Sequence, residues 1–78
     1  MLSVQCKMAR AALGLGVREL AEKAKVSPET VVRLEQGAAL RDRTLTAIRT
    51  ALEAAGIEFI AENGGGAGVR LRKDAAGE

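Results

Sequence analysis

The segment from Leu13 to Gly37 most constrains the fold, because it carries the pattern of two short amphipathic helices joined by a tight turn. Apolar residues recur at helical spacing on both sides of Lys25-Val26-Ser27, the expected turn. Ser27 is a favourable N-cap and Pro28 a favourable first helical residue, so the second helix of the pair is predicted to begin there. Gly37 can adopt the left-handed conformation that ends a helix. The pattern indicates a helix held against its neighbour with its first turn pointing outward.

Apolar residues at helical spacing predict a mainly α fold, with four helices followed by a short C-terminal β-hairpin. The helices are expected at about residues 4–13, 17–24, 28–36 and 44–55. Their inward faces are predicted to carry Cys6, Ala9, Leu13, Leu20, Ala21, Ala24, Val31, Leu34, Leu45, Ile48 and Leu52. Gly16 is the expected N-cap of the second helix, and Glu19 in its first turn suits the positive end of the helix dipole.

Beyond Gly56 the pattern changes from helical to alternating. Residues 57–60 and 69–72 are predicted strands, and the Gly-rich run between them favours a chain reversal over a helix. A two-stranded hairpin alone is only marginally stable in water, so this one is expected to rest on the fourth helix or to pair with another subunit. The candidate dimerisation residues are its apolar ones, Ile57, Phe59, Ile60, Val69 and Leu71.

The expected organisation is a helix-turn-helix domain at residues 1–56, a hairpin extension at residues 57–72 and a disordered tail at residues 73–78. A chain of 78 residues builds only a small core, and a partner subunit often supplies the missing burial. The chain is also expected to be too short for a separate effector domain. A controlling signal would then arrive through protein concentration, a regulatory protein partner or competition for the binding site.

Charge distribution is more informative than the net charge of +2. Residues 1–50 carry nine Lys and Arg against five Asp and Glu, whereas residues 51–78 carry three against five. The basic excess thus accompanies the helix pair, as a phosphate-binding face requires. The chain has no His and one Cys, so the commonest metal ligands and general base are missing, and neither an enzyme nor a cofactor is expected. No signal peptide or membrane span is recognisable, so a cytoplasmic location is expected.

Residues 5–56 resemble the lambda-repressor-like, Cro/cI-type (XRE) helix-turn-helix family. The matching features are Leu13-Gly14, Glu19-Leu20-Ala21, Val26-Ser27, Val31, and Leu34-Glu35 followed by Gly37. The segment IEFIAENGGGAGVRLRK is similar to the C-terminal extension of a short bacterial subgroup of that family. The resemblance implies a lambda-repressor-like bundle of four to five helices that binds operator DNA, usually as a homodimer, with the first turn of the third helix in the major groove.

The resemblance also implies DNA contacts from three segments. The groove-facing positions are Ser27, Pro28, Glu29, Thr30 and Arg33. The start of the second helix, at Val17 and Arg18, would lie on the phosphate backbone, and the loop before the fourth helix would place Arg41, Arg43 and Thr44 on the next phosphates, toward the minor groove. The family often has Gln at the position of Val17 and polar amides at those of Pro28 and Glu29. Matching positions of Arg10 and Glu35 can hold a salt bridge between helices one and three.

Each of these residues also has a simpler interpretation. Arg33 can pair with guanine, or it can contact a phosphate or only solvent. Glu29 can accept from cytosine or merely complement the helix dipole, and Thr30 can contact a thymine methyl or a phosphate. Pro28 can serve only to start its helix or can also contact a thymine methyl. The arginines at positions 18, 41 and 43 are phosphate clamps or ordinary polar surface, and the Arg10–Glu35 pair is a salt bridge or two independent charges.

Together these features favour a sequence-specific DNA-binding transcriptional regulator. A homodimer would place two copies of the third helix in successive major grooves about 34 Å apart, on an inverted-repeat operator. Repression by blocking polymerase is the simplest output, and activation from a second operator is the other. The alternative is a protein-interaction module, antitoxin-like or an adaptor subunit, for which DNA binding is secondary.

Overall fold

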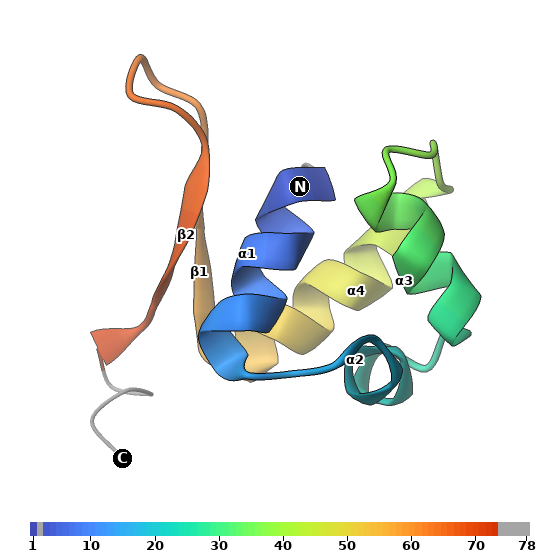
Figure 1. Cartoon of the computed structure of the whole chain (residues 1–78). Coiled ribbons are helices and arrows are strands. Elements are labelled where there is room, and N and C mark those ends of the chain that lie inside the picture. The colour runs from blue at the N-terminus through green and yellow to red at the C-terminus, as the bar shows by residue number, and fades with distance from the viewer. Residues whose placement is uncertain (2, 74–78) are drawn as a thin grey trace.

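The computed structural model describes residues 1 and 3–73, and the expected tail beyond Lys73 lies outside them. The described part contains four helices followed by an antiparallel β-hairpin, which confirms the predicted mainly α fold (Figure 1). The helices are α1 (Ser3–Leu13), α2 (Val17–Ala24), α3 (Pro28–Glu35) and α4 (Asp42–Ala54). The strands are β1 (Ile57–Ile60) and β2 (Gly68–Leu71).

The core forms where all four helices and β1 meet. Its largest fully buried side chains are Leu20, Ile48, Leu52, Ile57, Val31 and Cys6. The remaining predicted inward residues are buried or packed against this cluster, Leu13 and Leu45 being half-buried at its edge. Aliphatic side chains therefore form the interior, and the single aromatic residue, Phe59, packs against it from the hairpin.

The link between α2 and α3 is a short turn in which Lys25 adopts a left-handed backbone conformation, with a φ of 59°. The amide of Val26 donates to the carbonyl of Ala21 at 3.0 Å, and the half-buried Val26 side chain packs against the core. Ser27 then starts α3, because its hydroxyl oxygen accepts from the amide of Thr30 at 3.2 Å. These local interactions fix the angle between α2 and α3.

Helix α4 begins at Asp42, two residues before the predicted start at Thr44. Arg41 is its extended N-cap, and the carboxylate of Asp42 in the first turn favours the positive end of the helix. Arg43 and Thr44 therefore both belong to the first turn of α4, and the prediction that placed Arg43 in the loop before the helix was wrong. The second strand was predicted at residues 69–72, one residue too late, since β2 covers Gly68–Leu71.

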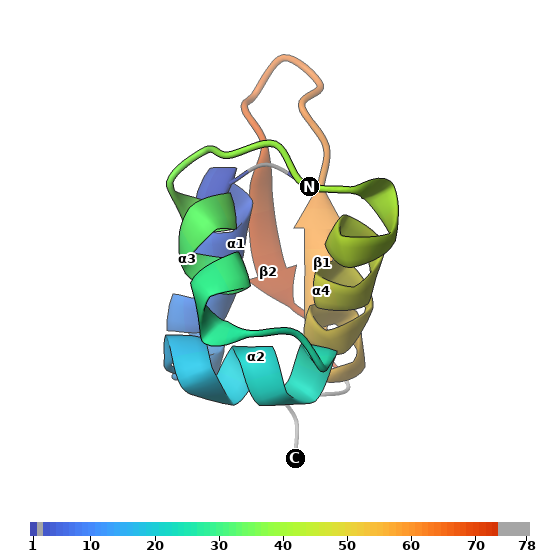
Figure 2. The same ribbon diagram turned by 90° about the vertical axis from the view of Figure 1, so that its right-hand side faces the viewer.

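The hairpin covers one side of the bundle, on α1 and α4. Ile57 pairs with Leu71 and Phe59 with Val69, so these four apolar side chains share one face. Figures 1 and 2 both place the hairpin on the side of the molecule opposite α3. The hairpin thus completes the core without covering the exposed surface of the helix pair.

Two side-chain interactions hold the hairpin to the helices. The side-chain amide of Gln5, which is buried in α1, donates to the carbonyls of Ile60 at 3.0 Å and Gly68 at 2.9 Å. On α4, the guanidinium of Arg49 lies 5.0 Å from the centre of the Phe59 ring, within range of a cation–π interaction. The hairpin therefore rests on the helices of its own chain. This was one of the two arrangements expected from the sequence, the other being pairing with another subunit.

Candidate nucleic-acid interface

A shallow groove separates the first half of α3 from the segment that leads into α4. It has a volume of about 550 Å³ and is lined by Val26, Ser27, Thr30, Arg33, Ala39, Leu40, Arg41 and Thr44. Figure 2 views the molecule from the side on which α2, α3 and the start of α4 lie, with the hairpin behind them. Five of the ten candidate DNA-contacting residues therefore meet at one concave surface between two helices.

The hydroxyl groups of Ser27 and Thr30 form a pair at the edge of this groove. Their oxygens lie 2.9 Å apart, and either atom can donate to the other. Whichever hydroxyl donates within the pair, the other keeps a proton that it can donate outward. The pair therefore presents one hydroxyl donor suited to a phosphate oxygen.

The first turn of α2 carries the candidates Val17 and Arg18. Arg18 is exposed, whereas the side chain of Val17 is half-buried and packs against the core. The turn is fixed by a capping interaction in which Glu19 accepts from the amide of Gly16 at 2.7 Å. A contact from Val17 to DNA would have to use its backbone, because its side chain has no polar atom and packs inward.

The first turn of α3 presents Pro28 and Glu29, both exposed, on the outer surface. Arg33 follows Glu29 by four residues and is also exposed, so the two side chains lie in one row along the helix. Arg43 is exposed at the start of α4, outside the groove lining. The predicted contact residues thus border the α3 surface from α2 on one side and from α4 on the other.

Arginines near the groove and arginines away from it differ in whether they form ion pairs. Away from the groove, Arg10 pairs with Glu35, Arg49 with Glu53 and Arg70 with Glu58. The groove-side arginines make no ion pair with any residue among 1 and 3–73; they are Arg18, Arg33, Arg41 and Arg43. Their positive charge is available to an external anion.

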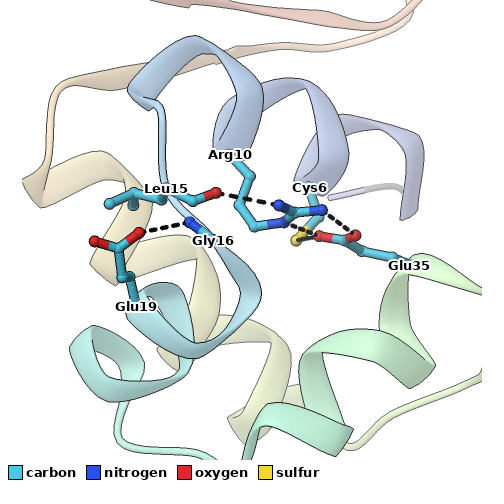
Figure 3. Close-up of polar contacts among 6 residues, drawn as sticks. All are labelled: Cys6, Arg10, Leu15, Gly16, Glu19 and Glu35. Carbon is cyan, nitrogen blue, oxygen red and sulfur yellow. Dashed lines mark hydrogen bonds and ion pairs between the residues drawn. The ribbon is translucent and has the colours of Figure 1, made fainter.

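The orientation of α3 is set by an ion pair between Arg10 on α1 and Glu35 at the end of α3 (Figure 3). The guanidinium donates to both carboxylate oxygens, from Nε at 2.8 Å and from Nη2 at 2.9 Å. Its Nη1 donates to the carbonyl of Leu15 at 3.1 Å. One side chain thus joins α1, the α1–α2 loop and α3, and Glu35 is buried in the process.

Cys6 adds a third donor to the same carboxylate, with its Sγ 3.3 Å from Oε2 of Glu35 (Figure 3). Burial, and then the adjacent Glu35 carboxylate, raise the pKa of the Cys6 thiol from 9.0 to about 12. Hydrogen bonding to Arg10 lowers the pKa of Glu35, and the same bond raises the pKa of Arg10. The cluster is therefore a thiol, a carboxylate and a guanidinium at neutral pH, with Cys6 inert as a nucleophile.

Sequence reasoning placed Cys6 in the core but missed its bond to Glu35, and it missed Gln5 altogether. No local signal predicts either, because their partners lie 29 and 55 or more residues away. The Gly16–Glu19 capping interaction could have been found, since a Glu three residues after an N-cap is a known signature of a helix start.

The raised pKa of Cys6 predicts a specific loss of stability in alkali. The folded protein holds the thiol proton more tightly than the unfolded chain, so the contribution is full below pH 9 and declines between about pH 9 and 12. The decline is at most about 1.4 kcal/mol per pH unit. Urea unfolding of the wild type and of Cys6→Ser, whose hydroxyl does not titrate there, should show the wild type losing stability faster above pH 9. Parallel curves for the two proteins would contradict this.

The candidate dimerisation residues are largely engaged within their own chain. Ile57 is 1% exposed, and Phe59 and Val69 pack against the core. Leu71 is 41% exposed, and Ile60 is half-buried at the other end of the ladder. A second copy of the chain could therefore contact the Leu71 end and the strand edges of the hairpin, but not its apolar face.

The Gly-rich loop between the strands is held by a neighbouring carboxylate. Glu62 accepts from the amides of Gly64 and Gly66, each at 3.1 Å, where positive φ values of 101° and 92° make glycine suitable. These amides therefore already bind an anion of the same chain. Within residues 1 and 3–73, no cluster of potential metal ligands occurs, and no helix is long and apolar enough to cross a bilayer.

The comparison with protein families gives one finding that bears on this surface. A family model described as helix-turn-helix matches residues 7–57, from α1 to the start of β1. A comparison with curated proteins gives no match. The matched range contains the groove, its unpaired arginines and the Arg10–Glu35 pair, and it covers well over half of the 78 residues. The chain belongs to the lambda-repressor-like, Cro/cI-type (XRE) helix-turn-helix family of DNA-binding transcription regulators.

Proposed function

We propose that the protein is a sequence-specific repressor that binds an inverted-repeat operator as a homodimer. The observation that carries this proposal is a contrast among arginines: those around α3 make no ion pair with a described residue, whereas Arg10, Arg49 and Arg70 are each ion-paired. A protein-interaction module has no need for several unpaired guanidinium groups around one helix. The same charges would supply phosphate neutralisation and a steep salt dependence of binding.

In this proposal Ser27, Thr30, Arg41 and Thr44 of the groove bind the phosphates, and the Glu29–Arg33 row, whose Arg33 also borders the groove, reads base edges. The Ser27–Thr30 hydroxyl pair lines the groove from the start of α3, and Arg41 and Thr44 line it from the start of α4, so a phosphate can approach both. Arg18 and Arg43 would bind the backbone at the two borders of α3. Binding would occur in the bacterial cytoplasm and would repress a promoter by excluding polymerase.

Selection of binding sites from random duplex DNA tests this function. We expect enrichment of an inverted repeat whose half-sites are centred about one helical turn, or 34 Å, apart. A single enriched half-site would reject the homodimer but keep the DNA-binding role. No enrichment at low salt would reject sequence-specific binding and favour the protein-interaction alternative.

Replacing Arg43 with alanine should weaken binding to the selected operator and to random DNA by similar factors. The reason is that a phosphate contact carries no sequence information, while its loss reduces the counterions released on binding. The slope of log K against log salt should become shallower by about 1 for each protomer bound. The measurement is a titration of labelled DNA at several salt concentrations.

Lys23→Ala is the matched control, because it removes the same charge from the surface between α2 and the end of α4, away from the groove. Its salt slope should equal that of the wild type. An unchanged slope in Arg43→Ala, or an equal change in both variants, would remove Arg43 from the phosphate contacts.

A further inference from the structure

Helix α3 exposes an apolar side chain beside the candidate contact residues. Val32 is 39% exposed, and in the described part of the chain only two other large hydrophobic residues, Val4 and Leu71, are similarly exposed. Single exposed apolar residues are common on protein surfaces and carry no meaning by themselves. The position of Val32 within α3 is what gives it significance.

Helical geometry places Val32 in a row with Pro28, because residues four apart lie on the same side of a helix. This row runs directly beside the exposed Glu29–Arg33 row. The opposite side of α3 is buried through Val31 and Leu34, and Thr30 faces the groove that leads to α4. The outer surface of α3 therefore consists of a charged row flanked by an apolar row of Pro28 and Val32.

The major groove presents one apolar group among its polar base edges, the C5-methyl of thymine. A β-branched side chain in a helix has a strongly preferred χ1 rotamer, so Val32 offers two methyl groups in a defined position at little entropic cost. A helix whose charged row reads polar edges would bring the adjacent apolar row against the neighbouring base pair. Covering Val32 with a methyl group would remove apolar surface from water on both partners.

We propose that Val32, supported by Pro28, reads a thymine methyl next to the base pair read by the Glu29–Arg33 row. The protein would then require thymine at one position of each half-site for its methyl group and not for its hydrogen-bonding edge. The inference rests on the proposed DNA binding through α3. It assigns part of the specificity to a residue without a polar side chain.

Deoxyuridine provides the test, because it differs from thymidine only in lacking that methyl. Each thymine of a selected half-site is replaced by deoxyuridine in turn, and the affinity of the whole protein is measured at fixed salt. We expect one position at which the wild type loses about fourfold in affinity, the factor expected for one buried methyl-sized group. Val32→Ala should bind the thymine and deoxyuridine sites within a factor of about 1.5 of each other, because the contacting methyls are gone.

Val4→Ala is the matched control, since it makes the same change at an exposed position of α1. It should keep the wild-type preference for thymine. Val32→Ala is expected to fold normally, because the position is exposed and alanine favours a helix, and a thermal unfolding curve checks this.

Three outcomes would overturn the inference while leaving the proposed function intact. They are no effect of deoxyuridine at any position, an effect that Val32→Ala leaves unchanged, and an effect that Val4→Ala abolishes equally. Failure of the wild type to prefer the selected DNA over random DNA would instead reject the proposed function itself. The two failures are therefore distinguishable in the same titrations.

Discussion

Replacing Arg10 with alanine should lower the free energy of unfolding by about 3 kcal/mol, the lower end of the cost of breaking a buried ion pair. The substitution leaves the carboxylate of Glu35, whose side chain is 7% exposed, with only the weak thiol donor of Cys6. Glu35 also ends α3, where the helix dipole disfavours negative charge. The Arg10 side chain itself is 23% exposed, which places the expected cost at the lower end of the range.

Arg70→Ala is the control for this prediction. It breaks the ion pair between Arg70 and Glu58 on the hairpin. The Arg70 side chain is 67% exposed and that of Glu58 46%, so the expected cost is at most about 1 kcal/mol. Combining Arg10→Met with Glu35→Gln should recover much of the loss, because no buried charge is then left unpaired. Urea unfolding of the four proteins measures these differences. A cost for Arg10→Ala no larger than that for Arg70→Ala would show that the Arg10–Glu35 pair stabilises the fold no more than an exposed ion pair does.

Replacing Arg33 with alanine should abolish the preference for the operator while leaving binding to random DNA nearly intact. A bidentate contact from arginine to guanine is worth about 2 kcal/mol of discrimination, and a homodimer makes two of them, so the preference should fall on the order of 10³-fold. Arg33 is exposed in the last turn of α3 and pairs with no carboxylate among the described residues, which leaves its guanidinium free to approach a base.

Arg33→Lys separates base reading from charge, because lysine keeps the positive charge but lacks the planar pair of donors. We expect it to bind random DNA as the wild type does and to prefer the operator only weakly. Competition titrations with operator and random duplexes measure both quantities. An equal loss on the two kinds of DNA in Arg33→Ala would assign Arg33 to a phosphate contact.

The helix pair could be predicted from the sequence because its signals are local. Ser27 and Pro28 start α3, and Gly37, with a φ of 92°, follows its end. The start of α4 was misplaced because Asp42 lies between two arginines in a stretch that also suits a polar loop. The structure starts the helix at Asp42, where its negative charge lies in the first turn, at the positive end of the helix dipole.

The interactions that position the site could be predicted only in part. The Arg10–Glu35 pair followed from the resemblance, since nothing in the spacing of the two residues brings α1 and α3 together. Gln5 and Cys6 are adjacent in α1, yet one binds the hairpin and the other binds α3. Tertiary packing decides such contacts, and a single sequence carries no periodic signal for them.

The bonds of Gln5 have a consequence for the order in which the chain acquires its structure during synthesis. Its two acceptors, the carbonyls of Ile60 and Gly68, leave the ribosome 55 and 63 residues after Gln5 itself. The side-chain amide of Gln5 can therefore make these bonds only after both strands have emerged and docked on α1. Because a strand pair of four residues each is marginal alone, we expect its ladder to form together with the Gln5 bonds. Hydrogen exchange of the strand amides would therefore report when α1 makes its final contact with the hairpin.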